Sequence, residues 1–177
     1  MNKALLSSSG FDWCTPQGFF DMLDAEFDFA LDVAATEENT KCANYYTPAI
    51  DGLAQPWNPR NGAVFCNPPY GREIGKWVKK AWSESILNPY VTIVMLLPAR
   101  TDTSYFHNYI YGYEHVIVRF LRGRLRFTDS AGKAYWPAPF PSMVVIYNYS
   151  PSKAYMKITR NIIESCAAGM NRGEKIE

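Results

Sequence analysis

A continuous apolar run at residues 91–97, interrupted only by one threonine, constrains the fold of this 177-residue chain more than any other feature. The run has the length of a β-strand and is far shorter than the roughly 18 apolar residues that a membrane-spanning helix needs. A strand that is apolar at nearly every position is typical of one buried on both faces. The run therefore predicts a sheet that is covered on both sides.

Strand-like and helix-like patterns alternate along the rest of the chain. Apolar runs predict further strands at residues 29–35, 63–66, 116–120 and 143–147. Helical spacing of apolar residues predicts helices from residue 16 to about 27, and over 72–88, 102–112 and 153–168. Residues 36–62 are expected to be mostly loop, with a short helix near Asn39 and a short strand near Leu53. This alternation favours an α/β fold with a largely parallel sheet.

The length bounds the domain organisation. A chain of 177 residues can bury one hydrophobic core and is too short for two full domains, so we expect a single domain over residues 11–168. Residues 1–10 are expected to form a flexible arm and residues 169–177 a polar tail. No secretory signal is evident, so we expect a cytoplasmic protein with free thiols and no membrane partner. Two histidines and no close cysteine pair argue against a metal site.

The net charge of +1 argues against a protein that binds nucleic acid through bulk positive charge. One stretch departs from this average, because it holds five basic residues against one acid: Arg119, Arg122, Arg124, Arg126 and Lys133. Within residues 122–126 the arginines alternate with smaller residues, so a strand there would place them on one face, where they suit phosphate or a guanine edge. The alternative is a solvated edge strand whose charges prevent pairing with other sheets.

The tetrapeptide Asn-Pro-Pro-Tyr at residues 67–70 directly follows the strand predicted at residues 63–66. Ligands of parallel sheets bind beyond the carboxyl ends of the strands, so this is a favourable position for chemistry. The side-chain carbonyl of Asn67 and the backbone carbonyl of Pro68 can accept both hydrogens of an exocyclic amine and so localise its lone pair. The two prolines fix these acceptors in advance, and Tyr70 offers a face for stacking. The alternative is a strand-ending turn with a packed tyrosine.

The 67–70 motif resembles the signature of amino-group methyltransferases that use S-adenosylmethionine, above all those acting on adenine in DNA. Similar stretches occur at residues 13–16, 31–35, 51–53, 97–101 and 123–127. Together they make residues 11–147 resemble the phage-type Dam family of DNA adenine methyltransferases. The resemblance implies a Rossmann-like methyltransferase fold with a mostly parallel central sheet and helices on both faces. It implies catalysis by the tetrapeptide: Asn67, Pro68, Pro69 and Tyr70.

The resemblance also implies S-adenosylmethionine as the cofactor and gives roles to three segments. Thr15 and Pro16 resemble the segment that meets the methionine carboxylate, and a helix N-terminus is a favourable place for an anion. Asp32 resembles the acid that pairs with the amino group, and Asp51 the acid that accepts a hydrogen bond from the cofactor's adenine amine. The implied cofactor-binding residues are Trp13, Thr15, Pro16, Asp32, Ala34, Ala35, Asn39, Asp51, Leu53 and Asn67.

Each of these positions also has an ordinary structural interpretation. Thr15 and Pro16 form a typical helix start, with the threonine as N-cap. Asp32 is a typical turn cap, and Asp51 with Gly52 is a common turn dipeptide. The glycine-rich loop of the broader methyltransferase pattern is absent after the first predicted strand. The ribose contact stays open among three residues: Glu37, Glu38 and Asn39.

The function that the resemblance implies is methylation of adenine in double-stranded DNA, with GATC as the suggested site and the target base flipped out of the duplex. The expected DNA contacts are Arg100, Arg122, Arg124, Arg126 and Lys133, most of them in a short recognition insert near residues 119–140. The oligomeric state stays open, with a monomer favoured. A palindromic site does not force a dimer, because a monomer can modify each strand in turn. Two alternatives stay open: methylation of a protein glutamine or another amino group, and a catalytically silent DNA-binding module on the same fold.

Overall fold

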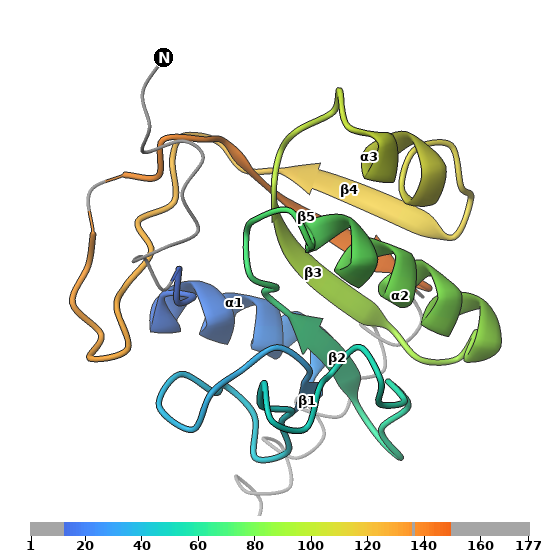
Figure 1. The fold of residues 1–177 in the computed structure, drawn as a ribbon, viewed down its shortest axis with the longest axis horizontal. Helices are drawn as coiled ribbons and strands as arrows, with labels where there is room; N and C mark the ends of the chain where they lie inside the picture. Colours follow the sequence, from blue (N-terminus) through green and yellow to red (C-terminus); the bar gives the residue numbers. More distant parts are fainter. Residues whose placement is uncertain (1–12, 136, 150–177) are drawn as a thin grey trace, which may run out of the picture.

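A computed structural model describes residues 13–135 and 137–149 of the chain. Within these residues five strands form one sheet in the order β1-β2-β3-β5-β4 (Figure 1). The strands are β1 (Phe29–Asp32), β2 (Ala63–Cys66), β3 (Ile93–Pro98), β4 (Val116–Phe120) and β5 (Ser142–Tyr147). The helices are α1 (Gln17–Phe27), α2 (Ile74–Leu87) and α3 (Ser104–Tyr109).

Most of the sheet runs in one direction. β1, β2 and β3 pair in parallel, and β5 lies antiparallel between β3 and β4. Four of the five described strands therefore point the same way, which confirms the predicted largely parallel sheet. The alternating patterns of the sequence did not predict that β5 would enter between β3 and β4 in the opposite direction.

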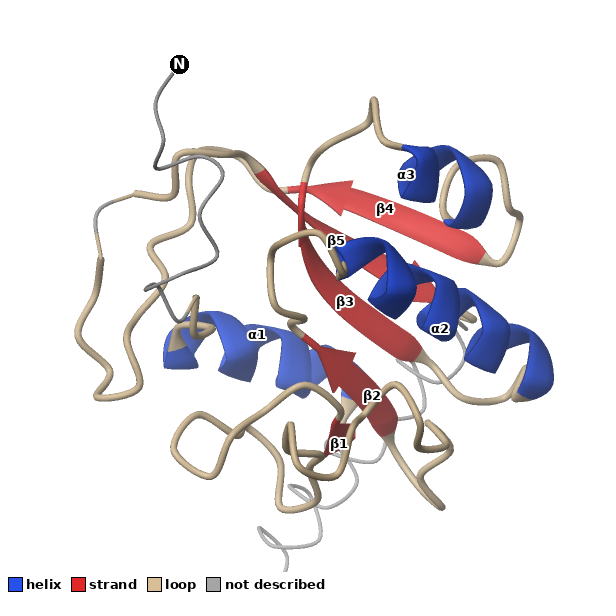
Figure 2. Cartoon of the chain, in the orientation of Figure 1, coloured by secondary structure: helices blue, strands red, loops and turns tan. Residues whose placement is uncertain are grey.

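Helices cover both faces of the sheet, as predicted (Figure 2). α2 and α3 pack on one face, where Trp77 and Phe106 meet the core, and α1 packs on the other through Phe20 and Leu23. Residues 93–97 of the central strand β3 are all 0% exposed. The apolar run that predicted a strand buried on both faces is thus at the centre of the molecule.

Several predicted boundaries differ from the structure. β1 ends at Asp32 rather than residue 35, because the Ala34 amide turns back to donate to the Asp32 carboxylate at 3.3 Å. The short helix predicted near Asn39 and the short strand near Leu53 are wrong, since both regions consist of turns. α1 has Pro16 at its N-cap position and no side-chain cap, so the prediction of a Thr15 cap is also wrong.

The predicted arm (residues 1–10), helix (153–168) and tail (169–177) lie outside the described residues. In the part of the chain that the structure describes, no helix is long and apolar enough to cross a membrane. Cys42 and Cys66 are buried free thiols, as predicted.

Candidate active site

A cavity of about 480 Å³ opens at the carboxyl ends of β1 and β2. Three loops line it: the segment that follows β1, the turns of residues 46–52, and the 67–70 motif that follows β2. A fourth contribution comes from residues 13–15, which precede α1. The parallel pairing of β1 and β2 brings these segments together, because both strands end at the same edge of the sheet.

The side chain of Asn67 is held in one orientation. Its Nδ2 donates hydrogen bonds to the Trp13 backbone carbonyl at 2.7 Å and to the Thr15 hydroxyl oxygen at 3.0 Å. A backbone carbonyl can only accept, so the nitrogen must face Trp13 and the oxygen must face away from it. Oδ1 is buried and has no hydrogen-bond partner in the described structure. An unsatisfied buried acceptor costs about 1–3 kcal/mol, so the site is prepared for a donor.

The other residues of the motif are fixed by their surroundings. Pro68 is buried and Pro69 exposed, and both line the cavity. The Tyr70 hydroxyl donates to the Leu96 carbonyl at 3.1 Å. The Tyr70 ring meets Phe127 and Phe140 edge-on, with ring centroids 5.9 and 5.6 Å apart. Burial raises the pKa of Tyr70 well above its usual value, so the ring stays neutral.

Asp32 places a negative charge at the floor of the cavity. Its carboxylate accepts hydrogen bonds from the backbone amides of Ala34 at 3.3 Å and Lys41 at 3.2 Å. The residue is 3% exposed, and this burial raises its pKa to about 6 against the lowering effect of the two amides. Within the described residues the Asp32 carboxylate accepts hydrogen bonds from backbone amides, and the charge of Lys41 also acts on it. A desolvated carboxylate of this kind favours a cationic ligand.

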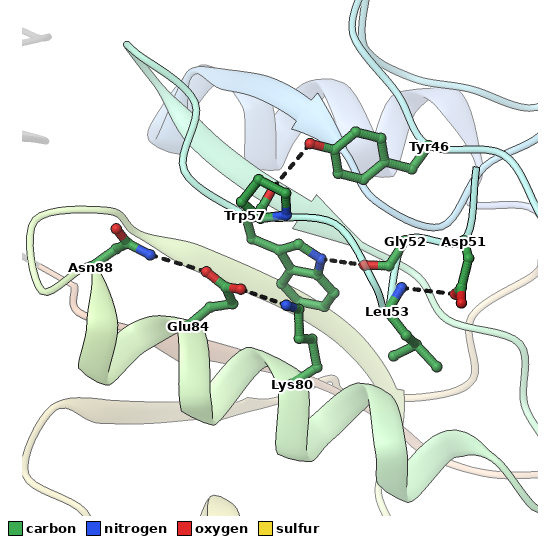
Figure 3. A network of polar contacts seen from close by, with 9 residues as sticks. Tyr46, Asp51, Gly52, Leu53, Trp57, Lys80, Glu84 and Asn88 are labelled. Carbon is green, nitrogen blue, oxygen red and sulfur yellow. Dashed lines mark hydrogen bonds and ion pairs between the residues drawn. The ribbon is translucent and has the colours of Figure 1, made fainter.

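Contacts of Gly52 with Trp57 and Val33 hold the turn that carries Asp51 (Figure 3 shows the Trp57 contact). Asp51 has a left-handed backbone with φ of 58°, and its Oδ1 accepts from the Leu53 amide at 3.1 Å. The buried indole of Trp57 donates to the Gly52 carbonyl at 2.8 Å. A Cβ atom on Gly52 would lie 2.1 Å from the Val33 carbonyl oxygen, so only glycine fits there. The second oxygen of Asp51 has no partner among the described residues.

The donors and acceptors of this cavity fit S-adenosylmethionine. Asp32 suits its ammonium group, and Asp51 offers a free acceptor for its purine amine. Ala34 and Gly52 leave room along the wall, because neither carries a bulky side chain. Within the described residues, no group of three or more His, Cys, Asp or Glu side chains is placed to hold a metal ion.

The structure gathers most of the predicted cofactor residues on the cavity, but Pro16 and Leu53 do not line it. Glu37 and Glu38 are exposed and also lie off the wall. Asn39 lines it, with its Oδ1 accepting from the Thr36 amide at 2.7 Å. Sequence reasoning did not assign ten further lining residues, of which the first three lie within the stretches that carry the resemblance and the others lie in no motif: Cys14, Val33, Gly52, Thr36, Lys41, Tyr46, Thr47, Pro48, Phe65 and Trp77.

The basic stretch forms an irregular hairpin (Figure 1). Phe127 of this hairpin meets the ring of Tyr70, which lines the cavity. Thr128 and Ala134 form an isolated antiparallel bridge around the turn at residues 129–132. Residues 122–126 do not form a strand in the structure, so the condition for placing their arginines on one strand face is not met. The basic side chains expected to contact DNA are nevertheless all exposed, and none lines the cavity: Arg100, Arg122, Arg124, Arg126 and Lys133.

Arg119 does not belong with these exposed cations. Its guanidinium donates two hydrogen bonds of 2.7 Å to the Glu26 carboxylate. It also lies over the rings of Phe27 and Tyr149, 5.6 and 5.4 Å from their centroids. The hydrogen bonds from Arg119 lower the pKa of the Glu26 carboxyl group. Arg119 thus joins β4 to α1 in the fold.

The fold and this site together define the class of Rossmann-like methyltransferases. The family model described as DNA N-6-adenine-methyltransferase (Dam) matches residues 3–172, and the chain belongs to that family. It is 36% identical over 109 residues to a DNA N-6-adenine-methyltransferase of Haemophilus phage HP1, covering 60% of this chain and 61% of the relative. It is 36% identical over 95 residues to a protein of the same name from Escherichia phage T1, covering 53% and 38% respectively. The matches therefore span less than two thirds of either relative.

Proposed function

We propose that this protein is a DNA adenine methyltransferase. It transfers a methyl group from S-adenosylmethionine to the exocyclic amine of an adenine that has been turned out of the duplex. The observation that carries the proposal is the buried, unpartnered Oδ1 of Asn67, in a motif that opens onto the cavity. Membership of the Dam family and the names of the two phage relatives support adenine as the target.

Methyl transfer to an exocyclic amine requires two fixed hydrogen-bond acceptors, and the 67–70 motif contains two candidates. Asn67 Oδ1 and the Pro68 carbonyl accept the two hydrogens of the amine and draw its lone pair out of conjugation with the ring. S-adenosylmethionine, when bound, supplies a methyl group whose carbon–sulfur bond breaks as the nitrogen takes the carbon. The methylated nitrogen then releases one proton to water, so no strong base is needed. The Tyr70 ring gives the base a stacking surface.

The remaining groups have supporting roles. Asp32 and Asp51 would hold the two ends of the cofactor, and Asn39 is the candidate for its ribose. The exposed arginines of the hairpin would hold phosphates or base edges on both sides of the target, since guanidinium groups suit both. We further propose GATC as the recognition sequence, a monomer as the working unit, and the cytoplasm of a bacterial or phage-infected cell as the location.

One experiment tests the function. The protein is incubated with methyl-labelled S-adenosylmethionine and unmodified duplex DNA, either with or without GATC sites, and the DNA is digested to nucleosides. The proposal expects the label in N6-methyladenine, and only from DNA with GATC if that site is correct. Label in an added protein instead would favour a glutamine methyltransferase. DNA binding without transfer would favour a silent binding module, and either result would contradict the proposal.

A further inference from the structure

Residues 13–15 lie between the basic hairpin and the catalytic motif and contact both. On one side, the Trp13 carbonyl and the Thr15 hydroxyl accept the two hydrogen bonds from Asn67 Nδ2. On the other side, the backbone of Cys14 pairs reciprocally with Thr128 of the hairpin, at 3.1 and 3.0 Å. Residues 13–15 therefore link the hairpin directly to Asn67.

We propose that Thr15 is a positioning residue for catalysis, which fixes the orientation of the Asn67 amide while the hairpin holds Thr15 in place. This inference rests on the proposed function. It differs from the role that the family resemblance implies for Thr15, which is contact with the methionine carboxylate. The Thr15 side chain is almost fully buried, at 3% exposed, and it forms no cap on α1.

The Trp13 carbonyl decides which end of the Asn67 amide faces residues 13–15, and the Thr15 hydroxyl oxygen adds a second acceptor. With the Trp13 carbonyl alone, one N–H of Asn67 would be held and the other left without a partner inside a buried site. The Thr15 oxygen takes that second proton, so both N–H bonds have fixed directions and Oδ1 is aimed by elimination. A flipped amide would place Oδ1 against the Trp13 carbonyl, where two acceptors repel each other.

The hairpin stabilises this arrangement from behind. Besides the two backbone bonds between Cys14 and Thr128, the Trp13 ring packs edge-on against Phe127 and Phe140, with both centroids 5.4 Å away. The segment that holds Asn67 is therefore anchored to the same hairpin that presents the arginines. DNA held by those arginines would restrain the Thr15–Asn67 contact in its active geometry.

The experiment compares Thr15→Val, which keeps the shape but removes the hydroxyl, with Thr15→Ser, which keeps the hydroxyl. The first readout is the side-chain amide NMR signal of Asn67 in the protein without cofactor or DNA, assigned by its loss in Asn67→Asp. We expect Thr15→Val to shift this signal and speed the solvent exchange of its protons, while Thr15→Ser leaves both near wild type. Thr15→Ala must repeat the result, which guards against a packing effect of valine.

The second and third readouts separate positioning from cofactor binding. We expect the single-turnover methyl-transfer rate of preformed complexes to fall about 10- to 100-fold in Thr15→Val, in keeping with one lost hydrogen bond in a buried site. Cofactor affinity, measured by calorimetry, should change less than about twofold, and Thr15→Ser should restore the rate.

Two results would overturn the inference. One is an Asn67 amide signal that does not respond to Thr15→Val. The other is weaker cofactor binding in Thr15→Val with an unchanged rate from the bound complex, since that would assign Thr15 to the carboxylate. The NMR readout needs no activity, so wild-type protein that fails to methylate DNA would contradict the proposed function and leave the positioning of Asn67 to be decided separately.

Discussion

The indole nitrogen of Trp57 lies 2.8 Å from the carbonyl oxygen of Gly52, and this hydrogen bond fixes the turn that presents Asp51 to the cavity. Trp57 is itself 0% exposed and packs against Trp77 of α2, with ring centroids 6.1 Å apart. The Tyr46 hydroxyl adds a second tie by donating to the Pro56 carbonyl at 2.9 Å (Figure 3). The wall of the cavity that would meet the cofactor's purine is thus held by the core.

We expect Trp57→Phe to weaken S-adenosylmethionine binding about three- to tenfold, because the Gly52 carbonyl loses its donor. Gly52→Ala should be more harmful, since a Cβ there meets the Val33 carbonyl oxygen at 2.1 Å. Gly18→Ala is a suitable control, because nothing lies within 4 Å of its added Cβ. Calorimetric titration measures all three, and equal affinities in wild type and Gly52→Ala would contradict the account.

Asp32 predicts a pH dependence of cofactor binding. Burial raises its pKa to about 6 in the protein without ligand, so the carboxylate becomes protonated below that pH and no longer attracts an ammonium group. Affinity should fall up to about tenfold for each pH unit below 6. Asp32→Asn should bind weakly and without this dependence. The same pH slope in both proteins would show that another group is responsible.

The raised pKa of Asp32 also determines the direction in which folding stability changes with pH. The folded-state pKa of Asp32 lies above its ordinary value of 3.8, so the folded protein binds this proton more tightly than the unfolded chain does. The contribution of Asp32 to stability is therefore lost as pH rises through about 6, by about 1 kcal/mol between pH 5 and pH 7. Urea unfolding of wild type and Asp32→Asn at both pH values measures the difference. The expectation is contradicted if the free energy of unfolding rises more from pH 5 to pH 7 in wild type than in Asp32→Asn.

Arg119 and Arg124 should behave differently although both belong to the basic stretch of the sequence. Arg119→Ala should cost about 0.5–1 kcal/mol of stability, a small effect because the pair with Glu26 is partly solvated, and leave DNA affinity within about twofold. Arg124→Ala should keep stability and weaken DNA binding, with the slope of log affinity against log salt reduced by about 1. Fluorescence anisotropy at several salt concentrations tests this, and an unchanged slope for Arg124→Ala would contradict a phosphate contact.

Sequence patterns within single segments were enough to predict individual strands and helices and the position of the catalytic motif. The buried run of β3 and the amphipathic face of α2 follow from composition and spacing alone, and the 67–70 motif announced a site at a strand end. The sequence could not show that Thr15 would contact Asn67, because 52 residues separate them and only the folded sheet brings them together. For the same reason Arg119 looked like its neighbours, since its partner Glu26 lies 93 residues away.

The proposed mechanism depends on the buried, unpartnered Oδ1 of Asn67. The variant Asn67→Ala tests that role most directly. The measurement is the single-turnover rate of N6-methyladenine formation from a preformed complex, with cofactor affinity determined in parallel and the exposed Asn108→Ala as a matched control. We predict a rate loss of at least about a hundredfold in Asn67→Ala, with cofactor affinity within about threefold of wild type and Asn108→Ala unaffected. A rate near wild type in Asn67→Ala would contradict the assigned role of its side-chain carbonyl.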